Sequence, residues 1–409
     1  MVLVFIALVL AVMVTANWYV WRRLFRDTTS GPGWVRRAGA VLIGGGWLLA
    51  FGALIAERAG APFWLQRVLA WPGFLWLAVS IYLLLGLLAG EVVRPLLRRW
   101  LERRRPAEVP LRQAEPVPVG APATPEPEES APPLLAAPSR RLFVSRVIGG
   151  AVAAGAVGTV GLGTYGVLKG PSVKRVTVPL AKLPRGAHGY RITVVSDIHL
   201  SPVVGRGFAQ RVVDTINSTQ PDIVAVVGDL VDGSVKDLGP AAAPLRQLNA
   251  PAYFVTGNHE YFSGAEQWVE EVRRLGLLPL ENARTELPWF DLAGVNDIAG
   301  ESEGQGPDFA KALGDRDPAR ACVLLAHQPV QIHDAVEYGV DLQLSGHTHG
   351  GQLWPGNLIA AGANPTLAGL ERYGDTQLYV SRGAGAWGPP TRVGAPSDIT
   401  VIELASRKA

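Results

Sequence analysis

The sequence predicts an α/β protein in which a layered domain follows an α-helical transmembrane region. Three apolar runs fill most of the first 90 residues, and each approaches the ~20 residues that a helix needs to cross a bilayer. From about Gly186, short apolar runs alternate with helical stretches, which is the pattern of a sheet covered by helices. The chain is therefore expected to combine a membrane region with a domain that has its own core.

The membrane region is predicted to occupy residues 1–100 and to contain three helices. None of its apolar runs carries an ionised side chain in its interior. Trp18 and Tyr19 end the first run and Trp71 opens the third, as aromatic residues do at membrane interfaces. A fourth run is less hydrophobic, and its glycines and alanines permit close helix packing in a membrane. The four runs cover residues 2–20, 38–56, 71–90 and 147–168.

Residues 101–146 are predicted to form a proline-rich linker that ends in a twin-arginine-like motif. Ten prolines lie between Pro106 and Pro138, and proline removes backbone donors, so this stretch is expected to be extended. The segment Ser139-Arg140-Arg141-Leu142-Phe143-Val144 resembles a bacterial twin-arginine export signal, which makes that export machinery a candidate partner. The alternative is an ordinary arginine flank on the cytoplasmic side of the fourth run.

The arginines predict a multi-pass cell-membrane protein whose N-terminus faces out. Five arginines follow the first run and six follow the third, whereas only Arg58 and Arg67 separate the second from the third. Arginine-rich short loops stay in the cytoplasm. If the fourth run spans the membrane, the domain after it is extracytoplasmic.

Charge is distributed unevenly along the chain. Residues 1–170 hold 18 Lys and Arg against 9 Asp and Glu, whereas residues 171–409 hold 20 against 26. An acidic domain is a poor match to nucleic acid, so membrane lipid is the expected partner and nucleic acid is not. Cys322 is the only cysteine, so cysteine usage does not decide the compartment.

Polar motifs follow the predicted strands of the domain at their carboxyl ends, where α/β sheets place their ligands. The predicted strands are residues 191–196, 223–227, 252–256, 289–294, 322–326, 342–345, 377–380 and 398–404, with helices at 208–218 and 265–275. The motifs are Asp197-Ile198-His199, Gly228-Asp229, Gly257-Asn258-His259-Glu260, His327-Gln328-Pro329 and Gly346-His347-Thr348-His349-Gly350.

These motifs offer seven metal ligands in addition to His259. Carboxylates and imidazoles suit Mn, Fe or Zn better than Ca. Seven ligands are too many for one tetrahedral ion but sufficient for two ions that share a bridging carboxylate. The sequence therefore predicts a two-metal hydrolase whose ligands are Asp197, His199, Asp229, Asn258, His327, His347 and His349.

In this order the five motifs resemble the signature of the calcineurin-like metallophosphoesterases, over roughly residues 186–405. Two further segments, Gly350-Gly351-Gln352 and Tyr379-Val380-Ser381-Arg382-Gly383, are similar to its membrane-associated and exported bacterial branch. In that branch a transmembrane region precedes the domain. The resemblance implies a four-layer sandwich of two mixed β-sheets flanked by helices.

The resemblance also implies a role for each ligand. Asp197, His199 and His349 would hold one divalent ion (Mn, Fe or Zn), and Asp229 would bridge to a second. The second would be held by Asn258, His327 and His347. His259 would protonate the leaving group or bind the phosphoryl oxygen, so His259 and Asp229 are the expected catalytic residues.

For several other polar residues, a structural role is the alternative to a role in the site. His188 and His333 are expected at the surface, and Asp232 is expected to cap a turn or to support the ligands. Asp297 is interpreted as structural or substrate-facing. Arg382 is expected to pack or to form an ion pair, with phosphate contact as the alternative. Tyr261 is expected to have a structural role, with a position in the lining of the site as the alternative.

The implied function is a membrane-anchored phosphoesterase that hydrolyses a phosphomonoester or phosphodiester with water ionised between two metal ions. Tethering suggests a substrate linked to lipid or to the cell envelope. One alternative is a pyrophosphatase or phosphodiesterase acting on a lipid-linked nucleotide sugar of the lipid A type. Another is a non-catalytic binding or signalling membrane protein with a degenerate hydrolase domain. A transporter would need charged residues within the membrane, which the apolar runs lack.

Overall fold

The structure is a computed structural model that describes residues 2–103 and 140–407. The predicted linker Pro106–Pro138 lies outside the described residues. The chain divides into two compact units, of which one holds Met1–Gly45 and Ser80–Val157 and the other Gly46–Val79 and Gly158–Ala409. The compact units do not follow the predicted boundaries at 100, 146, 168 and 186, because parts of three of the four long helices belong to the second unit.

Four long helices precede the domain, and each is long and apolar enough to cross a membrane. They are α1 (Val2–Trp21), α2 (Trp34–Arg58), α3 (Phe63–Arg103) and α4 (Arg140–Leu168), with the short helix η1 (Arg22–Arg26) after α1. α3 has 41 residues. At 1.5 Å per residue this is about 62 Å, roughly twice the ~30 Å of the hydrocarbon layer, so part of α3 extends beyond it. Arg140 and Arg141 of the twin-arginine-like motif begin α4 and are exposed.

The domain contains two mixed sheets of six strands each, which confirms the predicted pair of mixed sheets. The first has the order β1-β12-β2-β3-β4-β5 and the second the order β10-β11-β9-β8-β7-β6. The first sheet contains β1 (Ser172–Leu180), β2 (Tyr190–Val195), β3 (Ile223–Val227), β4 (Ala252–Val255), β5 (Leu278–Pro279) and β12 (Asp398–Ser406). The second contains β6 (Ala283–Glu286), β7 (Asp291–Gly294), β8 (Cys322–Leu325), β9 (Leu342–Ser345), β10 (Gly369–Tyr373) and β11 (Thr376–Val380).

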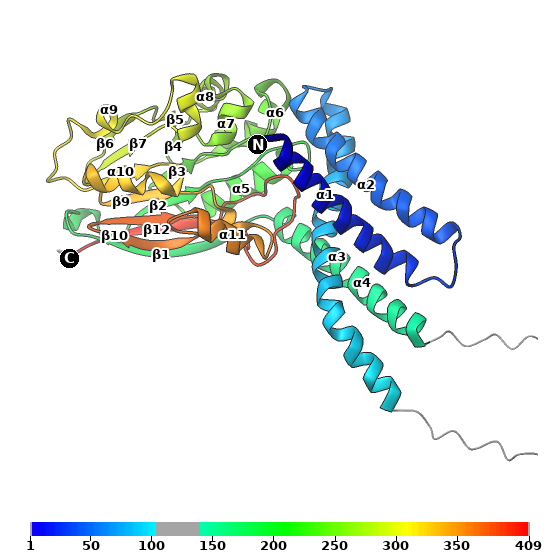
Figure 1. The fold of residues 1–409 in the computed structure, drawn as a ribbon. Coiled ribbons are helices and arrows are strands. Elements are labelled where there is room, and N and C mark those ends of the chain that lie inside the picture. Colours follow the sequence, from blue (N-terminus) through cyan, green and yellow to red (C-terminus); the bar gives the residue numbers. More distant parts are fainter. Residues whose placement is uncertain (1, 104–139, 408–409) are drawn as a thin grey trace, which may run out of the picture. The chain divides into compact units, whose positions relative to one another are not determined.

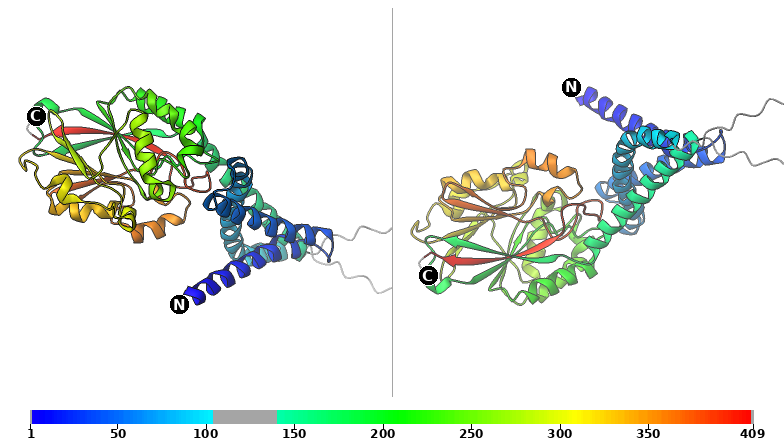
Figure 2. Two further views of the ribbon diagram at one scale, coloured as in Figure 1. Left: turned by 90° about the horizontal axis from the view of Figure 1, so that it is seen from above. Right: turned by 90° about the horizontal axis from the view of Figure 1, so that it is seen from below.

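Helices flank the two sheets (Figure 1). They are α5 (Arg206–Ser218), α6 (Val235–Ala242), α7 (Asn258–Ser263), α8 (Ala265–Arg274), α9 (Phe309–Leu313), α10 (Ile332–Glu337) and α11 (Gly356–Ala363). In both views of Figure 2 the strands lie between the green helices and the yellow and orange ones. The four-layer sandwich is therefore confirmed.

Alternation along the strands explains the layers, because successive side chains of a strand face opposite sides of its sheet. In β3, Val224 and Val226 face the helical layer of α5 and α8, whereas Ala225 and Val227 face the second sheet. In the second sheet Leu324 of β8 packs toward α9 and α10. Three apolar cores thus fill the three interfaces between the layers.

Three of the four long N-terminal helices contribute an end to the core between the first sheet and its helices. Ala53 of α2, Ala70 and Phe74 of α3, and Val167 of α4 are buried in the same cluster as Leu200. These residues all lie in the second compact unit. The domain therefore buries apolar surface against these helix ends, and its experimental study calls for the full chain.

The strands that sequence analysis missed are the edge strands. β1 is mostly exposed or half-buried along its length and pairs in parallel with β12, so it shows no continuous apolar run. β6 and β10 likewise contain few buried residues. The domain accordingly begins at Ser172 rather than near Gly186.

Candidate metal centre

The predicted ligands come together where strands of both sheets end. β2, β3 and β4 are neighbours in the first sheet, and β8 and β9 are neighbours in the second. Each of these strands is followed within one to four residues by a ligand. Since the carboxyl ends of parallel strands meet at one edge, residues far apart in the sequence converge there.

Asp229 lies at the middle of the cluster. Its Oδ2 atom is 3.2 Å from Nε2 of His327 and 3.7 Å from Nε2 of His199. Three overlapping groups have ligand atoms within 4.8 Å of one another: Asp197 with His199 and His349, His199 with Asp229 and His259, and Asp229 with His327 and His347. The Asn258 Oδ1 atom lies 3.0 Å from Nδ1 of His347, so the structure brings all seven predicted ligands together. Their roles as ligands stay a prediction.

The backbone at the ligands is unusual. Five of the seven are non-glycine residues in the left-handed region, which costs about 1–3 kcal/mol for each such residue. The strain persists because the surrounding loops fix it, and it turns the chain sharply where each strand ends. The five are Asp197 (φ 51°), His199 (47°), Asp229 (52°), His347 (72°) and His349 (52°).

Two glycines make room for this geometry. Gly228 has a φ of 72°, and a Cβ atom there would lie 2.6 Å from Nδ1 of His327. A Cβ atom on Gly257 would overlap the carboxylate of Asp229. Only glycine therefore lets these two loops approach as closely as the cluster requires.

The surroundings of His327 indicate whether the cluster can hold a cation. Its Nδ1 atom is 2.9 Å from the Val227 carbonyl oxygen, and a ring nitrogen must donate to that acceptor. Its Nε2 atom is buried and has no hydrogen-bond partner in the part of the chain that the structure describes. In the neutral ring this nitrogen is a lone pair that faces the Asp229 carboxylate. Two acceptors so placed repel each other unless a cation or a proton lies between them, so the position fits a metal ion.

Metal binding needs neutral imidazoles and ionised carboxylates. Burial raises the pKa of Asp197. Burial would lower the pKa of His327, but Asp229 outweighs it and raises that pKa well above its usual value, so a bound cation would have to displace protons from these two groups. Three other groups are already in the form that binds a metal. Burial, reinforced by His327, lowers the pKa of His347 to about 4. Burial and His199 lower the pKa of His349 well below its usual value. Burial would raise the pKa of Asp229, but His327 and His199 outweigh it and hold that pKa well below the usual range.

Asp232 connects a predicted ligand with the predicted acid. Its Oδ1 atom lies 2.8 Å from Nδ1 of His199 and 2.7 Å from Nδ1 of His259. Burial would lower the pKa of His259, but the hydrogen bond to Asp232 raises it to about 9. A turn cap was the first expectation for Asp232, but its side chain instead supports His199 and His259, which was the second expectation. In the sequence, only its position three residues after Asp229 indicates that Asp232 lies near the ligands.

Glu260 joins two of the ligand loops, a role that sequence analysis did not assign. Its buried carboxylate accepts hydrogen bonds from the backbone N–H groups of Asp229 (2.9 Å), Leu230 (2.8 Å) and Gly257 (2.6 Å). Burial, together with nearby Asp229, raises the pKa of Glu260 to about 7. The side chain thereby fixes the turn after β3 against the turn after β4.

Arg392 orients His349 and was not identified from the sequence, because no motif surrounds it. Its buried guanidinium donates to Nδ1 of His349 at 3.1 Å and to the His349 carbonyl oxygen at 3.0 Å. It also donates to the carbonyl oxygens of Gly385, Ala395 and Arg382. Arginine has no acceptor, so Nδ1 of His349 accepts this hydrogen bond and the proton of the neutral ring lies on Nε2. Metal binding through Nε2 would require that proton to leave, so the bonds to the backbone carbonyl oxygens are the ones that can hold the His349 loop beside a metal ion.

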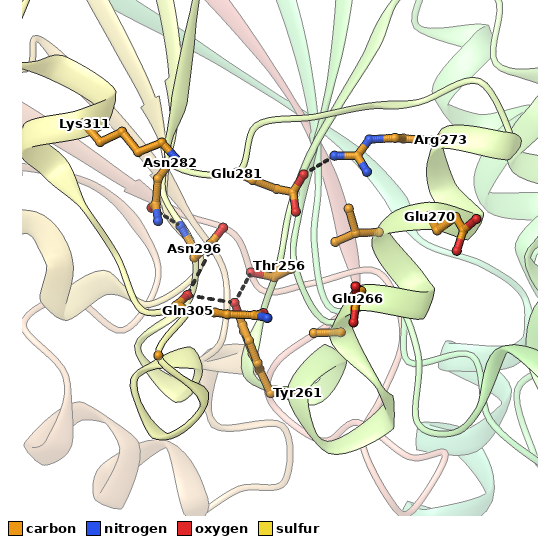
Figure 3. A pocket seen from close by; sticks show the side chains of 13 residues that line it. Thr256, Tyr261, Glu266, Glu270, Arg273, Glu281, Asn282, Asn296, Gln305 and Lys311 are labelled. Atoms are coloured by element: carbon orange, nitrogen blue, oxygen red, sulfur yellow. Dashed lines mark hydrogen bonds and ion pairs between the residues drawn. The ribbon is translucent and has the colours of Figure 1, made fainter.

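The other polar residues considered from the sequence have contacts of their own, and Asp297 among them bonds Gln328, the neighbour of His327. Tyr261 lines a separate pocket of about 600 Å³ and contacts Thr256 and the Gln305 carbonyl oxygen there (Figure 3). Asp297 caps the short helix Ile298–Glu303. As expected, His188 is exposed and Arg382 pairs with Asp398, 3.6 Å away. His333 is exposed in α10, with its ring near Tyr373.

Replacement of Arg392 by lysine should weaken metal binding. Lysine cannot reproduce the planar fork that holds the His349 loop through four backbone carbonyl oxygens, and loss of support around a ligand typically costs about 10–100-fold in metal affinity. Isothermal titration of the full chain with Mn²⁺ measures this. The control is Arg372→Lys at an exposed arginine that pairs with Asp375, where affinity should stay within about twofold. Equal affinity in both variants would show that Arg392 does not position the ligand.

Known proteins are similar to this chain over its domain. A family model described as calcineurin-like phosphoesterase matches residues 190–351. The "Transmembrane protein with metallophosphoesterase domain" of Danio rerio is 40% identical over 263 residues, covering 59% of this chain and 60% of that protein. The match thus spans less than two thirds of that relative's length.

Two bacterial relatives match over nearly their whole length. A metallophosphoesterase of Aquifex aeolicus is 34% identical over 242 residues, which cover 58% of this chain and 92% of that protein. The metallophosphoesterase YkuE of Bacillus subtilis is 31% identical over 284 residues, which cover 66% of this chain and 98% of that protein. With its clustered Asp and His side chains in a four-layer sandwich, the chain belongs to the calcineurin-like phosphoesterase family.

Proposed function

We propose that this chain is a membrane-anchored, binuclear metal-dependent phosphoesterase. The observation that carries the proposal is the position of Asp229 between two groups of ligand atoms. A phosphoester is anionic and repels a nucleophile. Two divalent ions, when bound, supply positive charge that lowers the pKa of water and offsets the charge of the phosphoryl group. The carboxylate, amide and imidazole donors suit Mn, Fe or Zn.

Different residues of the chain would hold each ion and orient its ligands. Asp197, His199 and His349 would hold one ion, and Asn258, His327 and His347 the other, with Asp229 shared. Asp232 keeps the His199 imidazole in orientation, and Arg392 holds the His349 loop through its backbone carbonyl oxygen. This arrangement holds the cluster rigid before a substrate arrives, so little reorganisation is needed during the reaction.

His259 is placed to protonate the leaving group. Its Nδ1 atom bonds Asp232, so the opposite edge of the ring is left to face a substrate. The side chain is 14% exposed, whereas that of His199 is fully buried, so a substrate can reach His259. With its raised pKa, His259 carries a proton near neutral pH, which a leaving oxygen can accept.

Two variants separate proton transfer from metal binding. His259→Gln should lower kcat by about 10²–10⁴-fold while metal content stays unchanged, since only the proton donor is lost. Asp229→Ala should lose bound metal as well as activity. Turnover of 4-nitrophenyl phosphate and of its bis ester is measured with Mn²⁺, alongside metal content by mass spectrometry.

The matched control for these variants is His188→Gln, at an exposed histidine outside the cluster, which should behave as the unaltered chain. Full activity in His259→Gln would contradict the role of His259. Full metal content in Asp229→Ala would contradict the shared ligand. An unaltered chain that cleaves neither ester with Mn²⁺, Fe²⁺ or Zn²⁺ would contradict the proposed activity.

We further propose that the domain is extracytoplasmic. The arginines place the C-terminal end of α2, the N-terminal end of α3 and the C-terminal end of α4 on one side of the membrane. Ala53, Ala70 and Val167, which lie toward these three ends, share one apolar core with the domain. The domain and the three ends are thus expected on the same, outer side.

Labelling with a membrane-impermeant maleimide tests this orientation in intact cells. Glu303→Cys places an exposed thiol in the domain and should be labelled without permeabilisation. Ser30→Cys, in the arginine-rich segment after α1, should be labelled only after permeabilisation. The native Cys322 is buried and free, so background labelling should be low. The reverse pattern would place the domain in the cytoplasm.

A further inference from the structure

A small apolar pocket lies beside the metal centre, and no part of the proposed reaction yet uses it. Its volume is about 150 Å³, and all of its lining residues belong to the second compact unit. α2 contributes Leu54 and Glu57, and α3 contributes Phe74 and Leu77. The domain contributes Ser201, Pro202, Asp232, Trp387, Gly388 and Pro389.

The pocket adjoins the centre directly. Asp232 lines it and also binds His199 and His259 through the same carboxylate oxygen. The Trp387 ring, on the other side, lies 5.8 Å from the His259 ring, centroid to centroid. A molecule whose phosphoryl group contacts the ligand cluster and His259 can therefore extend into this pocket with its next few atoms.

The lining indicates what kind of group belongs there. Most of it is aliphatic, aromatic or proline carbon, and no lysine or arginine is present among the described lining residues. Asp232 would repel a second anionic group, such as the rest of a diphosphate, and no cationic side chain of the described lining would offset that repulsion. A dry cavity of this volume holds a group about the size of benzene, which corresponds to roughly six carbons of a chain.

A second set of apolar side chains lies near the centre and points to the same environment. α11 follows the loop of His347 and His349, and none of its residues is buried. Leu358 and Ile359 of α11 are 68% and 79% exposed, and Phe262, whose ring lies 5.4 Å from that of His259, is 74% exposed. Such exposed apolar groups beside a site commonly mark contact with a membrane or an apolar partner.

We propose that the centre acts on a membrane lipid phosphoester whose apolar chain, next to the phosphate, lies in the pocket between α2, α3 and Trp387. This inference rests on the proposed phosphoesterase function and specifies its substrate class. The pocket is built partly from helices that are long and apolar enough to span a membrane, so a lipid can reach it without leaving an apolar environment. α11 and Phe262 would lie against the lipid surface.

A chain-length series tests the proposal with the full protein in amphipol and Mn²⁺. The substrates are n-alkyl phosphates and 4-nitrophenyl n-alkyl phosphodiesters from ethyl to decyl, below the concentrations at which they form micelles. Burial of one methylene favours binding by about fourfold. The value of kcat/KM should therefore rise at least about tenfold from ethyl to hexyl and then level off as the pocket fills.

Two substitutions in α2 locate the effect. Leu54→Trp should fill the pocket and reduce the rise to less than about threefold. The control, Leu48→Trp, alters a 74% exposed leucine of the same helix outside the pocket and should keep the full rise. In case Leu54→Trp does not fold, inhibition of the unaltered chain by n-alkyl phosphonates gives the same information. Their inhibition constants should fall with chain length in the same way.

The outcomes separate this inference from the proposed function. Metal-dependent cleavage of 4-nitrophenyl phosphate or its bis ester, with flat chain-length series for substrates and phosphonates, would overturn the lipid inference alone. A rise that persists in a folded Leu54→Trp variant would also overturn it, because the chain would then bind elsewhere. Absence of cleavage of every ester with Mn²⁺, Fe²⁺ or Zn²⁺ would instead overturn the proposed function.

Discussion

The placement of the Asp229 carboxylate is the constraint on which the rest of the centre depends. One oxygen accepts the backbone N–H of His259 at 2.9 Å, and the other faces His199 and His327 from opposite groups of ligands. The strained backbone, the missing Cβ of Gly257 and the bonds of Glu260 all hold this carboxylate in position. A small shift would separate the two groups of ligands and displace the proton donor.

The centre exists only because the two sheets pack against each other, since each supplies part of the ligand set. The helices long enough to span a membrane reach the same region through ordinary contacts. Thr164 of α4 bonds Thr391 at 2.7 Å, next to Arg392, which holds His349. A Cβ atom on Gly163 would lie 2.6 Å from the Arg392 carbonyl oxygen, so close packing at α4 limits where this loop lies. The C-terminal end of α4 and the loop that holds His349 are therefore in direct contact.

Sequence reasoning succeeded where a pattern is local. The strands Ile223–Val227 and Leu342–Ser345 lie where their apolar runs place them, and the motifs after them identify the clustered residues. It failed where the determining contact is distant. β1 is recognisable only through its pairing with β12, and Arg392 only through its contact with His349, 43 residues away. The local sequence does not indicate that Phe74 belongs to the domain core either, because an apolar helix end buried in a domain has the same composition as a membrane helix.

The most direct test of the shared Asp229 is electron paramagnetic resonance of the full chain loaded with Mn²⁺. Two ions held about 3.5–4 Å apart around one carboxylate should couple magnetically. At saturation the account predicts two Mn²⁺ per chain and the multiline spectrum of an exchange-coupled pair. A saturating stoichiometry of one, or two ions with the six-line spectrum of isolated Mn²⁺, would contradict it.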